Sequence, residues 1–254
     1  MKRPVAALAI AVCALVAGAA GLRAQAGPPM ITDDPGTTPA GHWTINTAWT
    51  DQRTPGSTLT GLPLLDANYG ATDRVELNYL ASWNTLRESD GPTANSLSDS
   101  ELSVKWRFWD HGERTLQVST APRLFLPGPG SDPHRPELAD PHTSFLLPIE
   151  IARDFSELSV GVELGDTFSR SAGSREWVGG FCVGRDIVKG WDVDAEIHTA
   201  ASENVARKEV TVNLGTRYEL NEHFTLLLSA GRDVRNTLGP KASLLTYAGM
   251  QICF

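Results

Sequence analysis

After its first 26 residues, the sequence has no apolar run of about 18 residues, the length that a membrane-spanning helix needs. Apolar residues at helical spacing are lacking too, because hydrophobic positions recur with a period of two almost throughout. These two absences exclude a helical bundle and a helical membrane protein. The period of two instead predicts an all-β chain.

Cysteine is scarce, and what there is excludes a disulfide framework. The 254 residues include three cysteines, and Cys13 lies in the apolar stretch at the N-terminus. Cys182 and Cys253 remain, at positions that point inward on strands far apart in the chain. We expect both to be free thiols without a catalytic role.

Basic residues are outnumbered. The chain has 22 basic and 30 acidic residues, a net charge of −8. An acidic chain of this kind excludes nucleic acid as a partner, because binding to phosphates depends on Lys and Arg.

The N-terminus has the pattern of a secretory signal peptide. Met1-Lys2-Arg3 is cationic, Val5 to Ala20 is apolar and small, and Ala24-Gln25-Ala26 offers a cleavage site. We therefore predict a signal peptide over residues 1–26. Its removal takes away Lys2, Arg3 and Arg23, which leaves 19 basic against 30 acidic residues.

The rest of the chain predicts twelve strands of about ten residues, the length of a tilted strand in a membrane. They span 43–50, 63–70, 74–83, 101–109, 115–125, 144–153, 157–168, 176–187, 191–200, 207–220, 223–233 and 243–254. Short connections alternate with longer ones rich in Gly, Pro, Ser and Asn. Short periplasmic turns facing longer outer loops are typical of a transmembrane antiparallel β-barrel. We assign residues 43–254 to this barrel.

The two faces of each strand differ in polarity. In 191–200, Trp191, Val193, Ala195 and Ile197 alternate with Asp192, Asp194, Glu196 and His198. Such a strand separates lipid from water, so we expect the apolar face to contact outer-membrane lipid and the polar face to line a lumen.

The final segment resembles the closing strand of a bacterial outer-membrane barrel. Leu244, Thr246, Ala248, Met250, Ile252 and Phe254 share one face, and the chain ends on this aromatic residue. The resemblance implies that Phe254 is part of the signal read by the barrel-assembly machinery. It also implies the outer membrane of a Gram-negative bacterium as the location.

Two strings near the N-terminus carry a second resemblance. Thr32-Asp33-Asp34-Pro35 and Pro63-Leu64-Leu65-Asp66-Ala67-Asn68-Tyr69-Gly70 are similar to a family of outer-membrane proteins labelled as transporters of the MetA pathway of phenol degradation. The resemblance is strongest over residues 29–80. It implies a barrel that passes small, often aromatic, compounds.

Charged residues on the inward face are the candidates for selectivity. The acidic ones outnumber the basic ones, and a wall of carboxylates favours cations. The alternative is a solvated wall in which arginines merely neutralise carboxylates. The residues are Asp66, Glu76, Glu101, Glu150, Glu163, Asp192, Asp194, Glu196 and Glu219, together with Lys105, Arg107, Arg123 and Arg217.

Residues 27–42 have no place in the wall, because four prolines prevent a strand or helix there. We predict that this segment folds into the lumen as a plug, with Asp33 or Asp34 pairing with Arg107 or Arg217. The alternative is a disordered periplasmic tail.

Together these features predict a passive channel or transporter for small molecules, hydrophobic or aromatic compounds among them. A non-transporting structural barrel and a lipid-modifying enzyme are the alternatives. His142 with Ser144, and His198 with Ser202, are the pairs an enzyme could use, but no third residue follows at a diagnostic spacing. Loop 126–143 contains carboxylates and two histidines. A loop of this composition more often forms solvated turns than a metal site. We assign no catalytic residue, metal or cofactor.

Overall fold

The computed structural model of the protein describes residues 27–111, 115–132, 134–155, 158–169 and 175–254. The predicted signal peptide lies outside these residues. The described part of the chain contains no helix long and apolar enough to cross a membrane.

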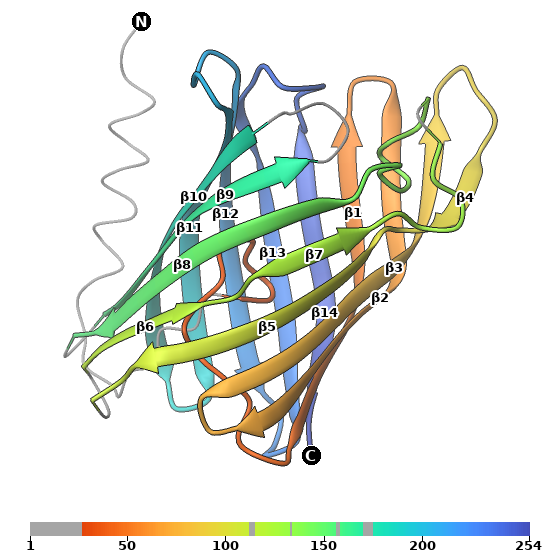
Figure 1. Cartoon of the computed structure of the whole chain (residues 1–254). Coiled ribbons are helices and arrows are strands. Elements are labelled where there is room, and N and C mark those ends of the chain that lie inside the picture. Colours follow the sequence, from red (N-terminus) through yellow and green to blue (C-terminus); the bar gives the residue numbers. More distant parts are fainter. Residues whose placement is uncertain (1–26, 112–114, 133, 156–157, 170–174) are drawn as a thin grey trace, which may run out of the picture.

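Fourteen strands are formed within the described residues, and all their pairings are antiparallel (Figure 1). They are β1 (Trp43–Thr54), β2 (Ser57–Thr72), β3 (Val75–Glu88), β4 (Ala94–Leu97), β5 (Ser100–Trp109), β6 (Leu116–Thr120), β7 (Arg123–Leu126), β8 (Ser144–Asp154), β9 (Ser159–Ser169), β10 (Arg175–Val188), β11 (Trp191–Ser202), β12 (Lys208–Glu219), β13 (Phe224–Asn236) and β14 (Leu244–Cys253).

The sheet closes on itself into a barrel with twelve wall positions. Strands that are consecutive along the chain pair with each other from β1 to β3 and from β8 to β14, β3 pairs with β5, and β14 pairs with β1 over Thr44 to Arg53. The wall position between β5 and β8 is shared by β6 and β7. The prediction of a twelve-stranded transmembrane barrel is confirmed.

Three details differ from the predicted strands. The segment 115–125 is two strands, because Pro122 has no N–H to give to the ladder. The predicted loop 51–62 is mostly strand, since β1 and β2 extend to a tight turn at Gly56, whose positive φ of 88° suits glycine. The short strand β4 adds a hairpin to the outer end of β3.

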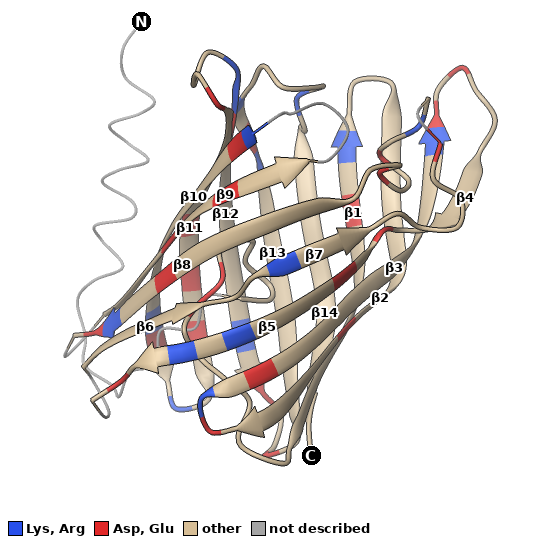
Figure 2. Cartoon of the chain, in the orientation of Figure 1, with Lys and Arg blue, Asp and Glu red and all other residues tan. Residues whose placement is uncertain are grey.

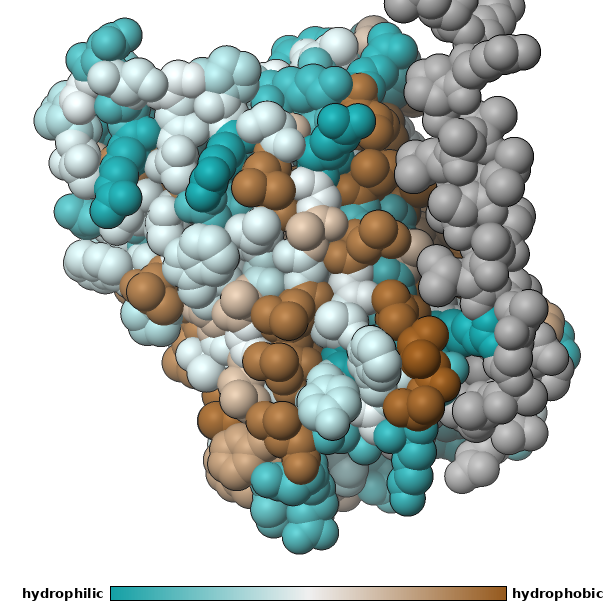
Figure 3. Space-filling model, turned by 180° about the vertical axis from the view of Figure 1, so that it is seen from behind, coloured by the Kyte–Doolittle hydropathy of each residue, from teal (hydrophilic) through white to brown (hydrophobic). Residues whose placement is uncertain are grey.

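The two faces of the wall differ as expected. Large apolar side chains point outward, among them Leu77, Val104, Leu164 and Leu214. Figure 3 shows apolar residues gathered over the strands between hydrophilic ends. Buried polar and charged side chains point inward, which places the polar core of the molecule inside the barrel.

Candidate functional site

The segment before β1 lies inside the barrel. In Figure 1 it is the red and orange chain that runs within the lumen before joining β1. Pro28, Pro29, Pro35 and Pro39 have no backbone N–H, so the segment has fewer donors to satisfy than an ordinary chain of its length. It makes its hydrogen bonds with inward side chains of the wall.

Wall carboxylates accept the backbone N–H groups of this segment. Glu196 of β11 accepts from Ile31 at 2.9 Å and from Thr32 at 2.8 Å. Glu163 of β9 accepts from the N–H of Asp33 at 3.0 Å, and Glu76 of β3 accepts from Thr38 at 2.6 Å. Hydrogen bonds to a charged acceptor are stronger than neutral ones.

Wall donors bind the carbonyl groups. The Arg217 guanidinium of β12 donates through Nη2 to the carbonyl of Gly27 at 2.9 Å and through Nε to that of Pro28 at 3.0 Å. Ser229 Oγ donates to the carbonyl of Pro29 at 2.9 Å. The wall thus satisfies both donors and acceptors of the segment, as a peptide-binding site does.

Asp33 is the main charged contact of the segment. Its carboxylate pairs with Lys105 Nζ and with Arg123 Nη2, each at 2.8 Å. Burial alone would raise the pKa of Asp33, but the attraction of the two cations outweighs burial and lowers the pKa to about 2. Asp33 therefore stays ionised inside the lumen.

The predicted partners of Asp33 and Asp34 were wrong. Arg107 pairs with Asp110 at 3.2 Å and donates to the carbonyl of Asp73, so it is engaged at the periplasmic end. Arg217 binds Asp194 at 3.2 Å and the carbonyls near Gly27. The segment reaches further into the lumen than expected, which brings Asp33 to Lys105 and Arg123.

Arg123 of β7 connects four carboxylates from different elements. Besides Asp33, its guanidinium lies 3.1 Å from Glu163 and 3.3 Å from Glu150, and its Nε lies 3.7 Å from Glu101. Figure 2 shows blue and red positions close together on the strands that face the lumen. The inward charges thus form an interconnected network, not isolated groups exposed to water.

The other candidate residues also point inward, with differing partners. Asp66 of β2 accepts from Asn68 on the same strand and from Asn46 and Asn78 on the two neighbouring strands. Asp192 lies 3.5 Å from Arg217. Glu219 is exposed at the periplasmic rim, beside Gly190. These charges were predicted from the sequence, whereas the amides of Asn46, Asn68 and Asn78 were not, although their inward parity is visible in the sequence.

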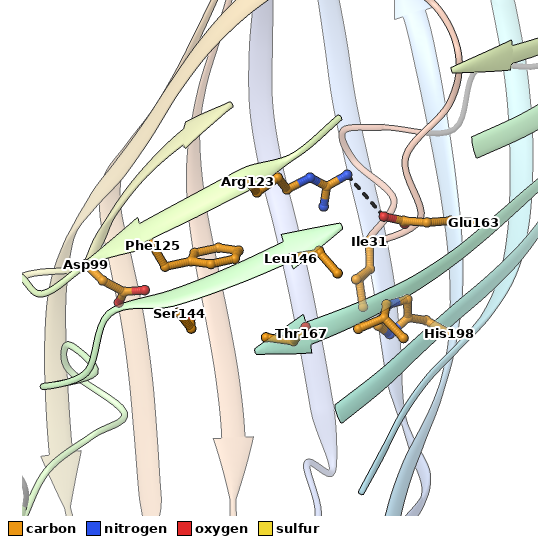
Figure 4. A pocket seen from close by; sticks show the side chains of 10 residues that line it. Ile31, Asp99, Arg123, Phe125, Ser144, Leu146, Glu163, Thr167 and His198 are labelled. Atoms are coloured by element: carbon orange, nitrogen blue, oxygen red, sulfur yellow. Dashed lines mark hydrogen bonds and ion pairs between the residues drawn. The ribbon is translucent and has the colours of Figure 1, made fainter. Parts of the chain in front are cut away.

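A cavity of about 300 Å³ lies in the outer half of the lumen (Figure 4). Ile31 of the N-terminal segment forms part of its wall, and Arg123 and Glu163 stand beside it. Its lining is mixed, with the apolar residues Ile31, Phe125, Leu146 and Val178 and the polar residues Asp99, Arg123, Ser144, Glu163, Thr167 and His198. A small amphipathic solute fits the chemistry of this lining.

The outer loop between β7 and β8 packs against the inward face of β3 at the outer end of the barrel. Leu138 and Ala139 are buried, and the carbonyl of Leu138 accepts from the inward amide of Asn84 at 2.9 Å. Among the described residues, no three His, Cys, Asp or Glu side chains are grouped so as to hold a metal ion. The carboxylates of this loop form local turns instead, such as Asp140 accepting from the N–H of His142.

The two histidine–serine pairs do not form a catalytic arrangement in the described part of the chain. Ser202 Oγ donates to Asn204 and to the carbonyl of Arg207, and neither contact involves His198. His142 is exposed and lies 3.0 Å from Asp140. No hydrogen bond joins it to Ser144 in the described residues.

No protein-family model matches the sequence, and no curated protein matches it. Its fold is similar to that of the COG4313 outer membrane channel from Pseudomonas putida F1, with a TM-score of 0.72 and 14% identity over 87% of this chain and 98% of that one. The KdgM porin in complex with disordered oligogalacturonate has a TM-score of 0.57 and 12% identity over 83% and 99% of the two chains. The NanC porin has a TM-score of 0.55 and 10% identity over 82% and 98%. The chain therefore has the fold of outer-membrane β-barrels.

Proposed function

We propose that the protein is a passive outer-membrane channel for small molecules whose lumen is occluded by its own N-terminal segment. One observation carries this proposal. The barrel is closed, polar inside and apolar outside, and its N-terminal segment is held in the lumen by hydrogen bonds and ion pairs. A barrel with a purely structural role does not need a peptide bound inside its lumen. We call residues 27–38 the plug.

The solutes are small and amphipathic, hydrophobic or aromatic compounds among them. The mixed lining of the outer cavity supports this class, because Phe125 and Leu146 offer apolar contact while Ser144 and Thr167 offer hydroxyl groups. The sequence resemblance to the phenol-degradation family favours the same class. The similar folds described above are those of an outer membrane channel and two porins, which also favours passage over enzymatic activity.

The test is conductance of the purified protein in planar bilayers, with deletion of residues 28–38. We expect the deletion to raise single-channel conductance several-fold, because it removes the peptide from the lumen. The double variant Asp33→Asn/Asp34→Asn should raise the open fraction with less effect on the fully open conductance.

A variant that changes no charge should also release the plug, independently of the deletion and of the Asp33/Asp34 variant. A Cβ on Gly180 of β10 would overlap the side chain of Thr32, so Gly180→Ala should displace the plug. Gly179→Ala is the matched control, because Gly179 faces outward and its Cβ would meet only Thr199 at 3.2 Å and Leu164 at 3.7 Å. Conductance that is the same in the wild type, the deletion and Gly180→Ala would contradict an occluding plug.

A further inference from the structure

Gly27 is buried in the lumen, directly after the predicted cleavage site Ala24-Gln25-Ala26. Its backbone nitrogen donates to the carbonyl of Thr32 at 2.7 Å, and its own carbonyl is held by Arg217. The first residue of the predicted mature chain is therefore a fixed part of the plug and not a loose end.

The plug turns back on itself so that two carboxylates face Gly27. An ideal Cβ on Gly27 would lie 3.6 Å from Asp33 Oδ1 and 4.0 Å from Asp34 Oδ2. Asp33 already has Lys105 and Arg123 as partners. Asp34 accepts the N–H of Gly36 through Oδ1, and within the described residues no basic side chain lies at ion-pair distance from it.

Burial raises the pKa of Asp34 to about 6. A carboxylate in such a place is stabilised by a nearby cation, and Lys105 and Arg217 act on it only from a longer distance. The site around Asp34 thus has carboxylate oxygens, but within the described residues Asp34 lacks a cation in contact.

Signal-peptide cleavage supplies a cation at this point. Hydrolysis of the Ala26–Gly27 bond consumes one water molecule and leaves a carboxylate on Ala26 and an ammonium group on Gly27. Glycine carries only hydrogen where other residues carry Cβ, so rotation about its Cα–C bond lets the freed nitrogen occupy that position. The nitrogen then leaves the Thr32 carbonyl and lies close to Asp33 Oδ1 and Asp34 Oδ2.

We propose that the carboxylates of Asp33 and Asp34 form a binding site for an α-ammonium group, whose ligand is the new N-terminus at Gly27. Processing by the signal peptidase completes the docked plug, because the unprocessed chain has an amide at this place. The docking contacts support this inference whether or not solutes pass through the barrel.

Competitive labelling with limiting acetic anhydride tests the proposal on the full processed protein. Trypsin releases residues 27–53, and mass spectrometry of this peptide gives both the first residue and the extent of labelling at the α-amine. An α-amine normally has a pKa of about 7.7–8.0, and carboxylate partners raise it. At pH 7 we expect labelling at least about tenfold slower in the folded barrel than in the heat-unfolded protein, which is one pKa unit.

Two variants with a matched control make the result specific. Asp34→Asn should restore most of the labelling rate, while Asp90→Asn, an exposed outer-loop carboxylate, should leave protection unchanged. Insertion of one serine after Ala26 moves the amine away from the site and should also restore labelling, with every carboxylate in place. Heat modifiability on gels verifies that each variant is folded.

The proposal is overturned if the mature chain begins at another residue, or if the folded and unfolded wild type label at the same rate. It is equally overturned if protection survives both Asp34→Asn and the serine insertion. Because labelling does not involve passage of a solute, these outcomes are independent of the conductance test.

Discussion

At the scale of single residues, the lumen depends on a few cations shared among many carboxylates. Arg123 is the clearest case, because its guanidinium joins the plug to β5, β8 and β9 through Asp33, Glu101, Glu150 and Glu163. The sequence shows that this arginine points inward. It does not show which strands face each other across the lumen, so its partners could not be predicted.

Replacing Arg123 by methionine should destabilise the barrel by about 3–5 kcal/mol, because it takes the paired cation away from the buried carboxylate of Glu163 and removes one of the two cations beside Glu150. The measurement is the temperature at which the folded band disappears on gels. Arg53→Met is the control, since Arg53 is 56% exposed and its pair with Asp51 is worth at most about 1 kcal/mol. An equal fall of the unfolding temperature in the two variants would show that the network around Arg123 stabilises the barrel no more than an exposed ion pair does.

Asp33→Asn should weaken plug docking in a pH-dependent way. The pKa of Asp33 is lowered in the folded state from 3.8 to about 2, so its charge stabilises the docked plug above pH 3.8 by about 2 kcal/mol. This contribution is lost as the pH falls through about 2.

The comparison is the unfolding temperature of wild type and Asp33→Asn at pH 7 and at pH 2. We expect a clear difference at pH 7 that largely disappears at pH 2. A difference of the same size at both values would mean that the carboxylate acts through shape and not through charge.

At the scale of elements, the wall could be predicted and the course of the plug could not. Parity along each strand depends only on neighbours in the sequence, so the faces of β11 and β12 were predictable. The plug crosses to strands that are distant in sequence, and its position depends on the stagger of the whole sheet. Inward glycines are the signal that was missed, because a Cβ on Gly70, Gly180 or Gly215 would collide with plug residues.

The closing strand β14 gives a prediction at this scale. Phe254 exchanges two backbone hydrogen bonds with Trp43, at 2.7 and 3.0 Å, and its side chain is 58% exposed. Deleting Phe254 should lower the heat-modifiable fraction in outer membranes, since it removes the last pair of the seam and the terminal aromatic group. Phe224→Ala, at a neighbouring aromatic residue of the same end, serves as the control. Normal insertion of the deletion variant would count against a role for Phe254 in assembly.

At the scale of the whole molecule, the lumen has an excess of negative charge, and the plug occupies some of its carboxylates. Glu196 is occupied by backbone N–H groups of the plug, and Asp194 is paired with Arg217. Cation preference should therefore be stronger in the barrel without residues 28–38 than in the intact protein.

The measurement is the reversal potential in a salt gradient. In the deletion background, the triple variant Asp192→Asn/Asp194→Asn/Glu196→Gln should reduce the preference for cations. A reversal potential that does not change would place these carboxylates away from the path of the ions.

A short connection joins the plug to β1. Residues 39–42 tie the plug to the wall, and Gly41 and His42 are themselves bonded to Gly70 and Pro39. A ligand on so short a tether has an effective concentration in the millimolar range, so weak contacts suffice to keep it bound. The same peptide supplied free would block a plugless barrel only at concentrations of that order. A solute that opens the channel by displacement must compete with a ligand that never diffuses away.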